Sequence, residues 1–275
     1  MMLPHFDCET RLCISLAARP SSFGTRFHNF LYRELGLNFV YKACSPRELK
    51  AAVEGIRALG IRGSAVSMPF KEAVIELLDE IDPEAKAIGA VNTIVNDQGK
   101  LKGYNTDVSA VRALLRRHAS LAHMKVALLG SGGMAKAVAF GLREQAVRRC
   151  TVFSRNPETG KALASAYGFG WKPRIEQPNH DVLINLTPIG MGPNPQREIP
   201  FNRAMILSSK LVIDVVGSPP ETELIRLARS LGKSVIAGHE FTSLSGAEQF
   251  FLYTGVRPDP GSVGRAAEFA RADSS

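Results

Sequence analysis

Apolar runs alternate with amphipathic stretches over residues 11–69. The pattern predicts strand, helix, strand, helix and strand, in that order, over 11–19, 27–36, 38–44, 46–60 and 62–69. The first helix would end at Gly36, and the second would carry Pro46 near its first turn. Strands separated by helices are typical of a parallel sheet with helices across its faces.

The alternation begins again near residue 125. Strand, glycine turn and helix are predicted over 125–145. The pattern then predicts a strand, a helix and three strands over 150–155, 157–168, 181–188, 211–220 and 233–238. A helical tail begins at about residue 241. We therefore predict two α/β units and a helical tail, with the first boundary between residues 105 and 120.

The glycine turn of the second unit lies in the sequence VALLGSGGMAKAVA. Gly130 would permit a tight turn and Gly132 a close approach of the backbone to a pyrophosphate. Gly133 is an additional glycine, and Ala135 would allow close packing of the helix, whose N-terminal N–H groups face the anion. Because the glycines follow a strand and open a helix, the pattern favours a dinucleotide site over a structural turn.

The end of the next strand indicates which dinucleotide is bound. NAD-binding domains usually carry an acid at this point, whereas an arginine accommodates the 2′-phosphate of NADP. Ser154, Arg155 and Asn156 stand here, and the first acid, Glu158, comes later. We therefore favour NADP over NAD, with a surface arginine in a turn as the alternative.

The composition is that of a soluble globular chain, with 45% hydrophobic and 22% charged residues. No apolar run reaches about 18 residues, and the N-terminal MMLPHFDCET lacks the apolar core of a signal peptide. We therefore expect a cytoplasmic protein with no membrane partner. Cys8, Cys13, Cys44 and Cys150 lack metal-ligand spacing, so we expect reduced, unreactive thiols and no metal site.

The net charge of +8 favours an anionic partner without identifying it. A nucleic acid, a phosphorylated cofactor and an acidic substrate would each suit a basic protein. The densest basic stretch, RALLRRHAS, fits one face of a helix and is not a block of like charge. We therefore expect a small acidic substrate and a phosphorylated cofactor, and no nucleic acid.

Candidate chemical groups lie between residues 71 and 107. Lys71 follows a Pro-Phe pair, and its amine is either a surface charge or a group held over a pocket. Taken singly, Asn92, Asn105 and Asp107 are compatible with turns and a helix cap. A lysine beside an aspartate, facing a nicotinamide, would form an acid–base pair. Burial would lower the pKa of the amine and let it accept a hydroxyl proton, whereas the carboxylate would orient the amine and favour its charged form.

Nine segments, in order along nearly the whole chain, resemble the shikimate dehydrogenase family. They are PSSFGTRFHNFLY, SAVSMPFKEAV, GAVNTI, GYNTDV, LLGSGGMAKAVA, FSRN, NLTPIGM, DVVGSPPET and SGAEQFFLYTG. The resemblance implies an N-terminal α/β substrate-binding domain over 1–105 plus 241–275, and a Rossmann NADP-binding domain over 106–240. It also implies reversible, NADP-dependent interconversion of shikimate and 3-dehydroshikimate, within the chorismate pathway of aromatic amino acid biosynthesis.

The resemblance also implies roles for individual residues. Lys71 and Asp107 match the catalytic pair of the family. The substrate-binding positions are Ser22, Ser67, Asn92, Asp107 and Ser245. The cofactor-binding positions are Gly130, Ser131, Gly132, Gly133, Met134, Ala135, Ser154, Arg155, Asn156, Thr187, Val215 and Gly238, of which the last three line the nicotinamide end. Outside these sets, we interpret His28 as structural and Phe250, Phe251 and Tyr253 as a packed helix face.

At four positions the chain departs from the residues that are typical of the family. A serine that binds the substrate carboxylate falls on Gly24, a substrate-contacting tyrosine on Gly217, and a hydroxyl-binding glutamine on Ser245. A second cation of the NADP site falls on Thr159, with Lys161 nearby. We therefore expect a member of the shikimate-dehydrogenase-like branch with weak shikimate affinity and an enlarged pocket. The alternatives are a dehydrogenase for a related polyhydroxy acid such as quinate, and a non-catalytic NADP-binding sensor. We expect a monomer or a homodimer.

Overall fold

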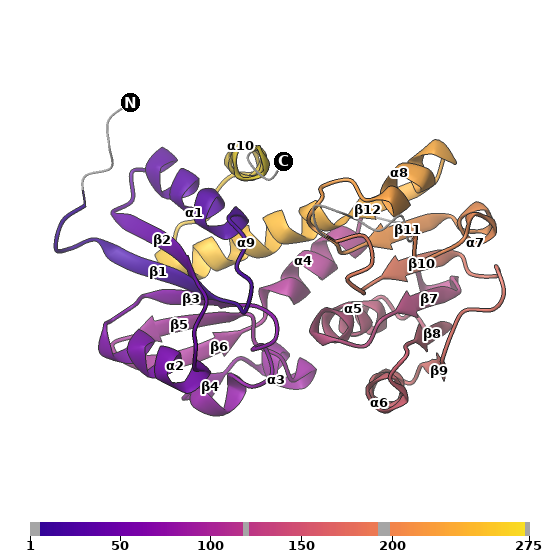
Figure 1. Ribbon diagram of the computed structural model, residues 1–275, viewed down its shortest axis with the longest axis horizontal. Helices are drawn as coiled ribbons and strands as arrows, with labels where there is room; N and C mark the ends of the chain where they lie inside the picture. The colour runs from indigo at the N-terminus through magenta and orange to yellow at the C-terminus, as the bar shows by residue number, and fades with distance from the viewer. Residues whose placement is uncertain (1–5, 118–120, 192–198, 273–275) are drawn as a thin grey trace. The chain divides into compact units, whose positions relative to one another are not determined.

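The computed structural model describes residues 6–117, 121–191 and 199–272 (Figure 1). The chain divides into two units, Met1–Thr106 together with Ser243–Ser275, and Asp107–Thr242. Each unit contains one six-stranded sheet with its own helices, which confirms the predicted α/β class.

The sheet of the first unit has the strand order β2-β1-β3-β5-β6-β4. Its strands are β1 (Arg11–Leu16), β2 (Phe39–Cys44), β3 (Gly63–Val66), β4 (Glu80–Ile81), β5 (Thr93–Asp97) and β6 (Lys100–Tyr104). β1 pairs in parallel with β2 and with β3, as the alternation of strands and helices predicts. β5 runs antiparallel to β3 and to β6, whereas β4 pairs in parallel with β6, so this sheet is mixed. The antiparallel strand lies beyond residues 11–69, the stretch for which parallel strands were predicted.

The hairpin of β5 and β6 is the part of this sheet that the apolar pattern does not predict. Its turn is Gln98-Gly99, with φ angles of 50° and 89°. A two-residue turn with positive φ at both positions matches the twist of antiparallel strands, and glycine adopts such angles without strain. Asn96 Oδ1 accepts a hydrogen bond from Gly99 N at 2.8 Å, which stabilises the turn. The hairpin places Thr93 and Tyr104, its two ends, opposite each other.

In the residues that the structure describes, the first unit carries four complete α-helices and most of a fifth. They are α1 (Phe23–Glu34), α2 (Leu49–Ala58), α3 (Pro83–Ile88), α10 (Pro260–Arg271) and α9 (Gly238–Thr254), which enters the unit at Ser243. α2 begins three residues after Pro46, because the side chain of Glu48 accepts hydrogen bonds from Lys50 N and Ala51 N and caps the helix there.

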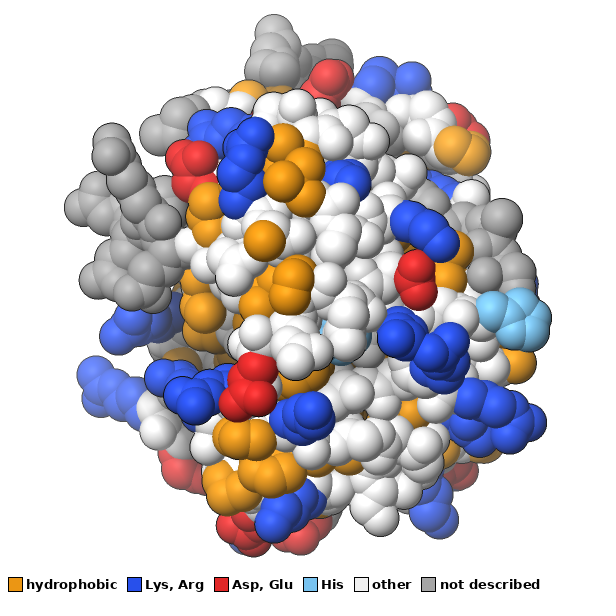
Figure 2. Space-filling model, turned by 90° about the vertical axis from the view of Figure 1, so that its right-hand side faces the viewer, with side chains coloured by type: hydrophobic (Ala, Val, Ile, Leu, Met, Phe, Trp, Pro, Cys, Tyr) orange, Lys and Arg blue, Asp and Glu red, His pale blue; other side chains and the backbone are white. Residues whose placement is uncertain are grey.

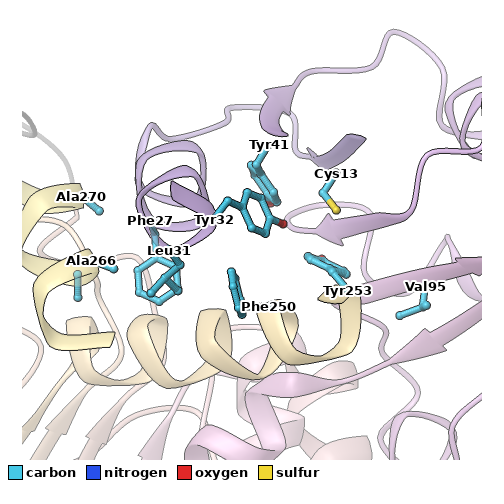
Figure 3. Packing of buried hydrophobic residues seen from close by; sticks show 11 residues of the cluster. Cys13, Phe27, Leu31, Tyr32, Tyr41, Val95, Phe250, Tyr253, Ala266 and Ala270 are labelled. Carbon is cyan, nitrogen blue, oxygen red and sulfur yellow. The ribbon is translucent and has the colours of Figure 1, made fainter. Parts of the chain in front are cut away.

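An aromatic core lies between α1, α9 and α10 (Figure 3). Phe27 and Tyr32 of α1 pack with Phe250 and Tyr253 of α9, and Ala266 and Ala270 of α10 close the cluster. The predicted packed face is therefore confirmed for Phe250 and Tyr253, whereas the Phe251 ring is partly exposed beneath Arg257, at 4.0 Å. His28 is 1% exposed in the same core, and its ring stacks on Tyr41 with 4.4 Å between centroids.

The sheet of the second unit is parallel throughout, in the order β12-β11-β10-β7-β8-β9. Its strands are β7 (Val126–Leu129), β8 (Cys150–Phe153), β9 (Gly170–Lys172), β10 (Val182–Asn185), β11 (Leu211–Asp214) and β12 (Ser234–Ala237). Counted from β7, this is the Rossmann order 6-5-4-1-2-3, which confirms the predicted Rossmann fold. β10 and β11 are buried over their whole lengths, as expected of parallel strands covered on both faces.

Helix α4 (Thr106–Leu115) follows β6 of the first unit and leads to β7. The helices that follow strands of this sheet begin at its carboxyl edge. They are α5 (Gly133–Glu144), α6 (Pro157–Tyr167), α7 (Arg203–Ser208) and α8 (Glu223–Ser230). The strand order reverses between β7 and β10. In sheets of this kind, ligands bind beyond the carboxyl ends of the strands at such a reversal.

The basic charge of the protein is dispersed. Figure 2 shows Lys and Arg side chains scattered among acidic and apolar ones on the face drawn, without one continuous basic block. Within the basic stretch that begins at Arg112, this arginine pairs with Glu144 and Arg117 with Glu240, each at 2.8 Å, and residues 118–120 lie outside the described residues. In the described part of the chain, no helix is both long and apolar enough to cross a membrane.

Candidate active site

Asn92 is the centre of a buried polar network in the first unit. It directly precedes β5 and is 3% exposed. Its Oδ1 accepts hydrogen bonds from Thr93 Oγ1 and Thr106 N, both at 2.8 Å, and from Thr106 Oγ1 at 3.2 Å. Its Nδ2 lies 3.4 Å from Ser245 Oγ. Because the amide oxygen already has three donors, the NH2 group is the side of Asn92 that can serve a ligand, as a donor.

Gln249 is a member of this network that the sequence analysis missed. Its Nε2 donates to Thr93 Oγ1 at 3.1 Å and to the Asn92 carbonyl oxygen at 3.3 Å. It lies four residues after Ser245 on α9, so the two side chains share a helix face. That spacing was the available signal, but only the tertiary fold shows that this face meets Asn92.

A backbone hydrogen bond brings Lys71 close to Asn92 within the first unit. Val91 N donates to the Lys71 carbonyl oxygen at 2.8 Å, and Asn92 is the next residue. Lys71 is half-buried in a turn, and the stretch after it forms only a short 3-10 helix at Ile75–Leu77. Asp107 directly follows Thr106, whose backbone N–H is bound by Asn92, in the first turn of α4. Lys71, Asn92 and Thr106 are thus gathered in one unit, and Asp107 is the first residue of the other.

The remaining polar candidates of the first unit differ in how far they are engaged. Ser22 is exposed at the N-cap of α1, where its side chain makes no capping hydrogen bond. Ser67 is exposed just after β3, held by a bond from its N–H to the Leu16 carbonyl oxygen at 2.9 Å. Asn105 is buried, and its Nδ2 donates to the Ala90 carbonyl oxygen at 2.9 Å. That bond makes Asn105 part of the hairpin's framework, whereas both serine side chains face solvent.

Two of the glycines at which the chain departs from the family differ in the space beside them. A Cβ on Gly24 would lie 3.4 Å from the Cε1 and Oη atoms of Tyr41, which is ordinary van der Waals contact. A Cβ on Gly217 would lie 2.8 Å from Thr242 Oγ1, so the Thr242 side chain would have to shift. The enlarged pocket therefore stays a prediction. At Ser245 the hydroxyl is used internally, because its Oγ lies 2.8 Å from Thr106 Oγ1.

The glycine turn of the second unit fits a dinucleotide pyrophosphate. Gly130 follows β7 with φ of +119°, and a Cβ there would lie 3.0 Å from the backbone of Leu186, which follows β10. Gly132 is the N-cap of α5 and has open space where a Cβ would lie, so a ligand can approach its backbone. Ala135 is fully buried, as close helix packing requires. The residues between them supply N–H groups at the helix N-terminus: Ser131, Gly133 and Met134.

The turn after β8 carries Arg155 between two side chains that form hydrogen bonds within the turn. Ser154 Oγ donates to the Asn156 carbonyl oxygen at 2.8 Å and accepts from Trp171 Nε1 at 3.0 Å. Asn156 Oδ1 caps α6 by accepting from Glu158 N at 2.9 Å. Both side chains shape the turn, and Arg155 between them is exposed. A guanidinium in this position suits a 2′-phosphate.

Two further side chains connect this turn to its surroundings. Thr159 Oγ1 lies 2.8 Å from Ser131 Oγ and links α6 to the glycine turn. Lys161 Nζ lies 5.1 Å from the centre of the Trp171 ring, within the range of a cation–π interaction. Thr159, where the family has a cation, therefore acts as a hydroxyl link between two loops.

The three candidates for the nicotinamide end follow the carboxyl ends of neighbouring strands. Thr187 Oγ1 donates to Asn185 Oδ1 at 2.6 Å, and Val215 N donates to the Asn185 carbonyl oxygen at 3.1 Å. Gly238 begins α9, and a Cβ there would lie 2.1 Å from the Val216 carbonyl oxygen, so only glycine fits. These loops after β10, β11 and β12 are therefore in mutual contact at one edge of the sheet.

The cysteines take no part in either site. All four are free thiols. Burial raises the pKa of the Cys13 and Cys150 thiols to about 12, so both remain protonated at neutral pH. A protonated thiol is a poor nucleophile, so the expectation of unreactive thiols is supported for these two buried cysteines.

Comparisons with known proteins agree with this arrangement of two units. Residues 20–94 match the shikimate dehydrogenase substrate binding domain. A shikimate dehydrogenase-like protein of Haemophilus influenzae is 46% identical over 96% of this chain and 97% of its own. A shikimate dehydrogenase (NADP(+)) of Pyrococcus abyssi is 40% identical over 84% of this chain and 87% of its own.

Solved structures extend the similarity to the whole fold. A shikimate 5-dehydrogenase-like protein superimposes with a TM-score of 0.90 at 45% identity, covering 98% of this chain and 100% of that one. The Thermus thermophilus shikimate 5-dehydrogenase, solved with NADP(H) and shikimate, has a TM-score of 0.83 at 31% identity, covering 94% and 99%. A Corynebacterium glutamicum quinate dehydrogenase, solved with NAD, has a TM-score of 0.81 at 28% identity, covering 94% and 98%. The chain therefore belongs to the shikimate dehydrogenase family, on its shikimate-dehydrogenase-like branch.

Proposed function

We propose that the protein is an NADP-dependent oxidoreductase that interconverts shikimate and 3-dehydroshikimate by hydride transfer. The observation that carries the proposal is the set of hydrogen bonds that gathers Lys71, Asn92 and Thr106 in one unit of a chain with a Rossmann glycine turn. The names of the relatives support the substrate and the cofactor, since curated and solved members of the family are NADP-linked shikimate dehydrogenases.

Lys71 and Asp107 are the proposed acid–base pair. When shikimate is oxidised, a carbinol carbon loses a hydride and its hydroxyl loses a proton, so that an alcohol becomes a ketone. NADP⁺, when bound, supplies the hydride acceptor. Lys71 Nζ takes the hydroxyl proton, and Asp107 orients the amine and stabilises the resulting ammonium. In the reverse direction the ammonium returns the proton to the carbonyl oxygen.

Asn92 is the proposed donor to a substrate oxygen. Its own oxygen is held by Thr93 and Thr106, so its NH2 group is presented in one orientation. Ser22 and Ser67 are the proposed hydroxyl contacts to the carboxylate and the ring. The absence of each family hydrogen bond at Gly24, Gly217 or Ser245 costs about 0.5–1.5 kcal/mol. Together the three replacements weaken shikimate binding about ten- to thousandfold relative to a member that keeps these bonds.

A second candidate substrate is quinate or another polyhydroxy acid. Ser245 replaces the glutamine that binds a substrate hydroxyl in the family, and its own hydroxyl is engaged by Thr106. A quinate dehydrogenase is among the similar structures, which favours this candidate over unrelated substrates.

Initial rates of NADP⁺ and NAD⁺ reduction with saturating shikimate or quinate test the proposal. Lys71→Ala is expected to lower kcat about a thousandfold with either acid, because the proton acceptor is lost. Lys86→Ala is the matched control, because Lys86 is an exposed lysine of the same unit on α3, and its rates are expected to equal those of the wild type.

The outcomes separate the alternatives. Turnover of shikimate that disappears in Lys71→Ala supports the proposal, and a higher kcat/KM for quinate selects the second candidate. Tight NADPH binding without turnover of either acid contradicts both and indicates a sensor. Full activity in Lys71→Ala contradicts the assigned chemistry.

A further inference from the structure

Asp214 is a fully buried carboxylate that the proposed chemistry does not use. It is the last residue of β11 and is 0% exposed. Its Oδ1 accepts hydrogen bonds from Asn185 Nδ2 at 3.0 Å and Val216 N at 3.2 Å, and its Oδ2 accepts from Thr222 Oγ1 at 2.6 Å. Burial raises the pKa of the Asp214 carboxyl above its ordinary value, because a charged carboxylate is costly to remove from water, and the hydrogen bonds from Thr222, Val216 and Asn185 offset part of that cost.

Through Asn185, the carboxylate reaches the loop after β10. The side chain of Asn185 is also buried, and its Nδ2 donates a second bond to the Ile189 carbonyl oxygen at 3.2 Å. Its Oδ1 accepts from Thr187 N at 3.1 Å and from Thr187 Oγ1 at 2.6 Å. Asp214 therefore holds the amide whose other end orients Thr187.

Through its other partners, the carboxylate reaches the loop after β11. Val216 N donates directly to Asp214 Oδ1, so this bond closes around Val215 and restricts its backbone. Thr222 closes the same loop at the start of α8, where its Oγ1 also accepts from Ile225 N at 3.3 Å. One carboxylate thus connects both ends of the 215–222 segment with the 185–189 segment.

We propose that Asp214 is a positioning residue that sets Thr187 and Val215 for the nicotinamide end of the dinucleotide. The inference rests on the proposed function, because it requires that NADP binds at the carboxyl edge of this sheet. Asp214 itself does not contact the cofactor. It acts through Asn185 and through the loop that Thr222 closes.

Asp181 provides a matched control within the same sheet. It directly precedes β10, so it lies at the amino edge of the sheet, whereas Asp214 lies at the carboxyl edge. Its Oδ2 accepts a bond from Lys125 N at 2.9 Å, and its Oδ1 lies 3.1 Å from Lys210 Nζ. Both aspartates support the fold through backbone and side-chain donors, but only Asp214 is linked to the loops after β10 and β11.

Calorimetric titration with two ligands tests the inference. NADP⁺ carries the nicotinamide, whereas 2′,5′-ADP retains only the adenosine end with its phosphates. Asp214→Asn is expected to raise the dissociation constant for NADP⁺ about tenfold, because one acceptor becomes a donor and the two loops lose their common support. The dissociation constant for 2′,5′-ADP is expected to stay within twofold. Asp181→Asn is expected to leave both constants unchanged, even where it lowers the melting temperature.

Thr222 offers a second pair of variants if Asp214→Asn does not fold. Thr222→Val removes the hydroxyl that donates to Asp214 and is expected to weaken NADP⁺ about threefold, whereas Thr222→Ser keeps the hydroxyl and the wild-type constant. Equal losses for both ligands, or a loss in Asp181→Asn as large as in Asp214→Asn, would overturn the inference and indicate a purely structural role. A wild-type protein that binds neither ligand would overturn the proposed function itself.

Discussion

The polar networks around Asn92 and Asp214 hold functional residues in two different ways. The network around Asn92 is neutral, and its amides and hydroxyls come from β5, α4 and α9, segments separated by up to 157 positions along the chain. The network around Asp214 has a carboxylate at its centre, and its members follow two neighbouring strands. The comparison teaches that a site built from neighbouring strand ends is largely local, whereas a site built from distant segments depends on the whole unit being folded.

Replacing the central amide is expected to have the largest effect on this comparison. Asn92→Asp would convert the NH2 donor into a second oxygen and add a charge opposite an acidic substrate. Losing a donor and facing like charges costs several kcal/mol, so KM for shikimate is expected to rise about a hundredfold, with a smaller change in kcat. Steady-state kinetics measure both constants.

Asn96→Asp is the control for that substitution. Asn96 is a buried asparagine of β5, the strand that Asn92 precedes, and its Nδ2 donates to the Ile56 carbonyl oxygen at 2.9 Å, within the framework of the hairpin. Its replacement is expected to lower the melting temperature and to leave KM within threefold. If both variants changed KM equally, the special role of Asn92 would be refuted.

The glycine turn allows fold and binding to be separated in the second unit. Gly130→Ala places a Cβ at positive φ against Leu186, so unfolding by urea is expected to show a loss of about 1–3 kcal/mol. Gly132→Ala has open space around the new methyl group, so its stability is expected to equal that of the wild type. Its dissociation constant for NADP⁺ is expected to rise about tenfold, since the methyl group occupies the approach to the pyrophosphate. Wild-type affinity in Gly132→Ala would show that the cofactor lies elsewhere.

The last expected effect concerns stability against pH in the core of the first unit, and it leaves activity at neutral pH unchanged. Burial lowers the pKa of His28 to about 3, from 6.5 for an exposed histidine. The unfolded chain therefore takes up a proton below pH 6.5 that the folded chain refuses until about pH 3, so stability falls as pH falls through this window. The loss from this group is about 1.4 kcal/mol per pH unit.

His28→Gln removes that titration. Urea unfolding at pH 7.5, 6.5, 5.5 and 4.5 is expected to show a flatter decline for the variant than for the wild type. His180→Gln is the control, because His180 is a half-buried histidine of the second unit, outside this core. Parallel curves for wild type and His28→Gln would contradict the assignment.

The second unit was the more predictable from the sequence. Its strand, glycine turn and helix are adjacent in the chain, and the conformations of Gly130 and Gly132 can be predicted from the local sequence. β10 and β11 were equally predictable from their apolar runs, because strands buried on both faces need no alternation of apolar and polar residues. The role of Asp214 at the centre of a hydrogen-bond network could not be predicted, since nothing in the sequence shows which loops its carboxylate contacts.

The first unit was predictable in its parallel strands and less so in its site. β5 and β6 were not predicted, because no clear apolar alternation marks them, although the Gln98-Gly99 turn between them is compatible with a hairpin. Gln249 and Tyr41 could not be assigned, because their roles arise from contacts with segments far away in the chain. The resemblance indicated which residues matter, and the packing shows which orientation Asn92 takes and which side chain lies beside Gly24.

The boundaries of the two units have a consequence for how such a protein can be assembled. The second unit is one uninterrupted insertion, residues 107–242, within a host sequence that resumes at Ser243. The host's flanks are already joined, because Thr106 Oγ1 lies 2.8 Å from Ser245 Oγ. The hydrogen bonds described above for the Asn92 network join residues of the host. A recombinant gene that exchanged the insertion for another dinucleotide-binding cassette would change the redox coenzyme without rewriting the residues that hold Asn92.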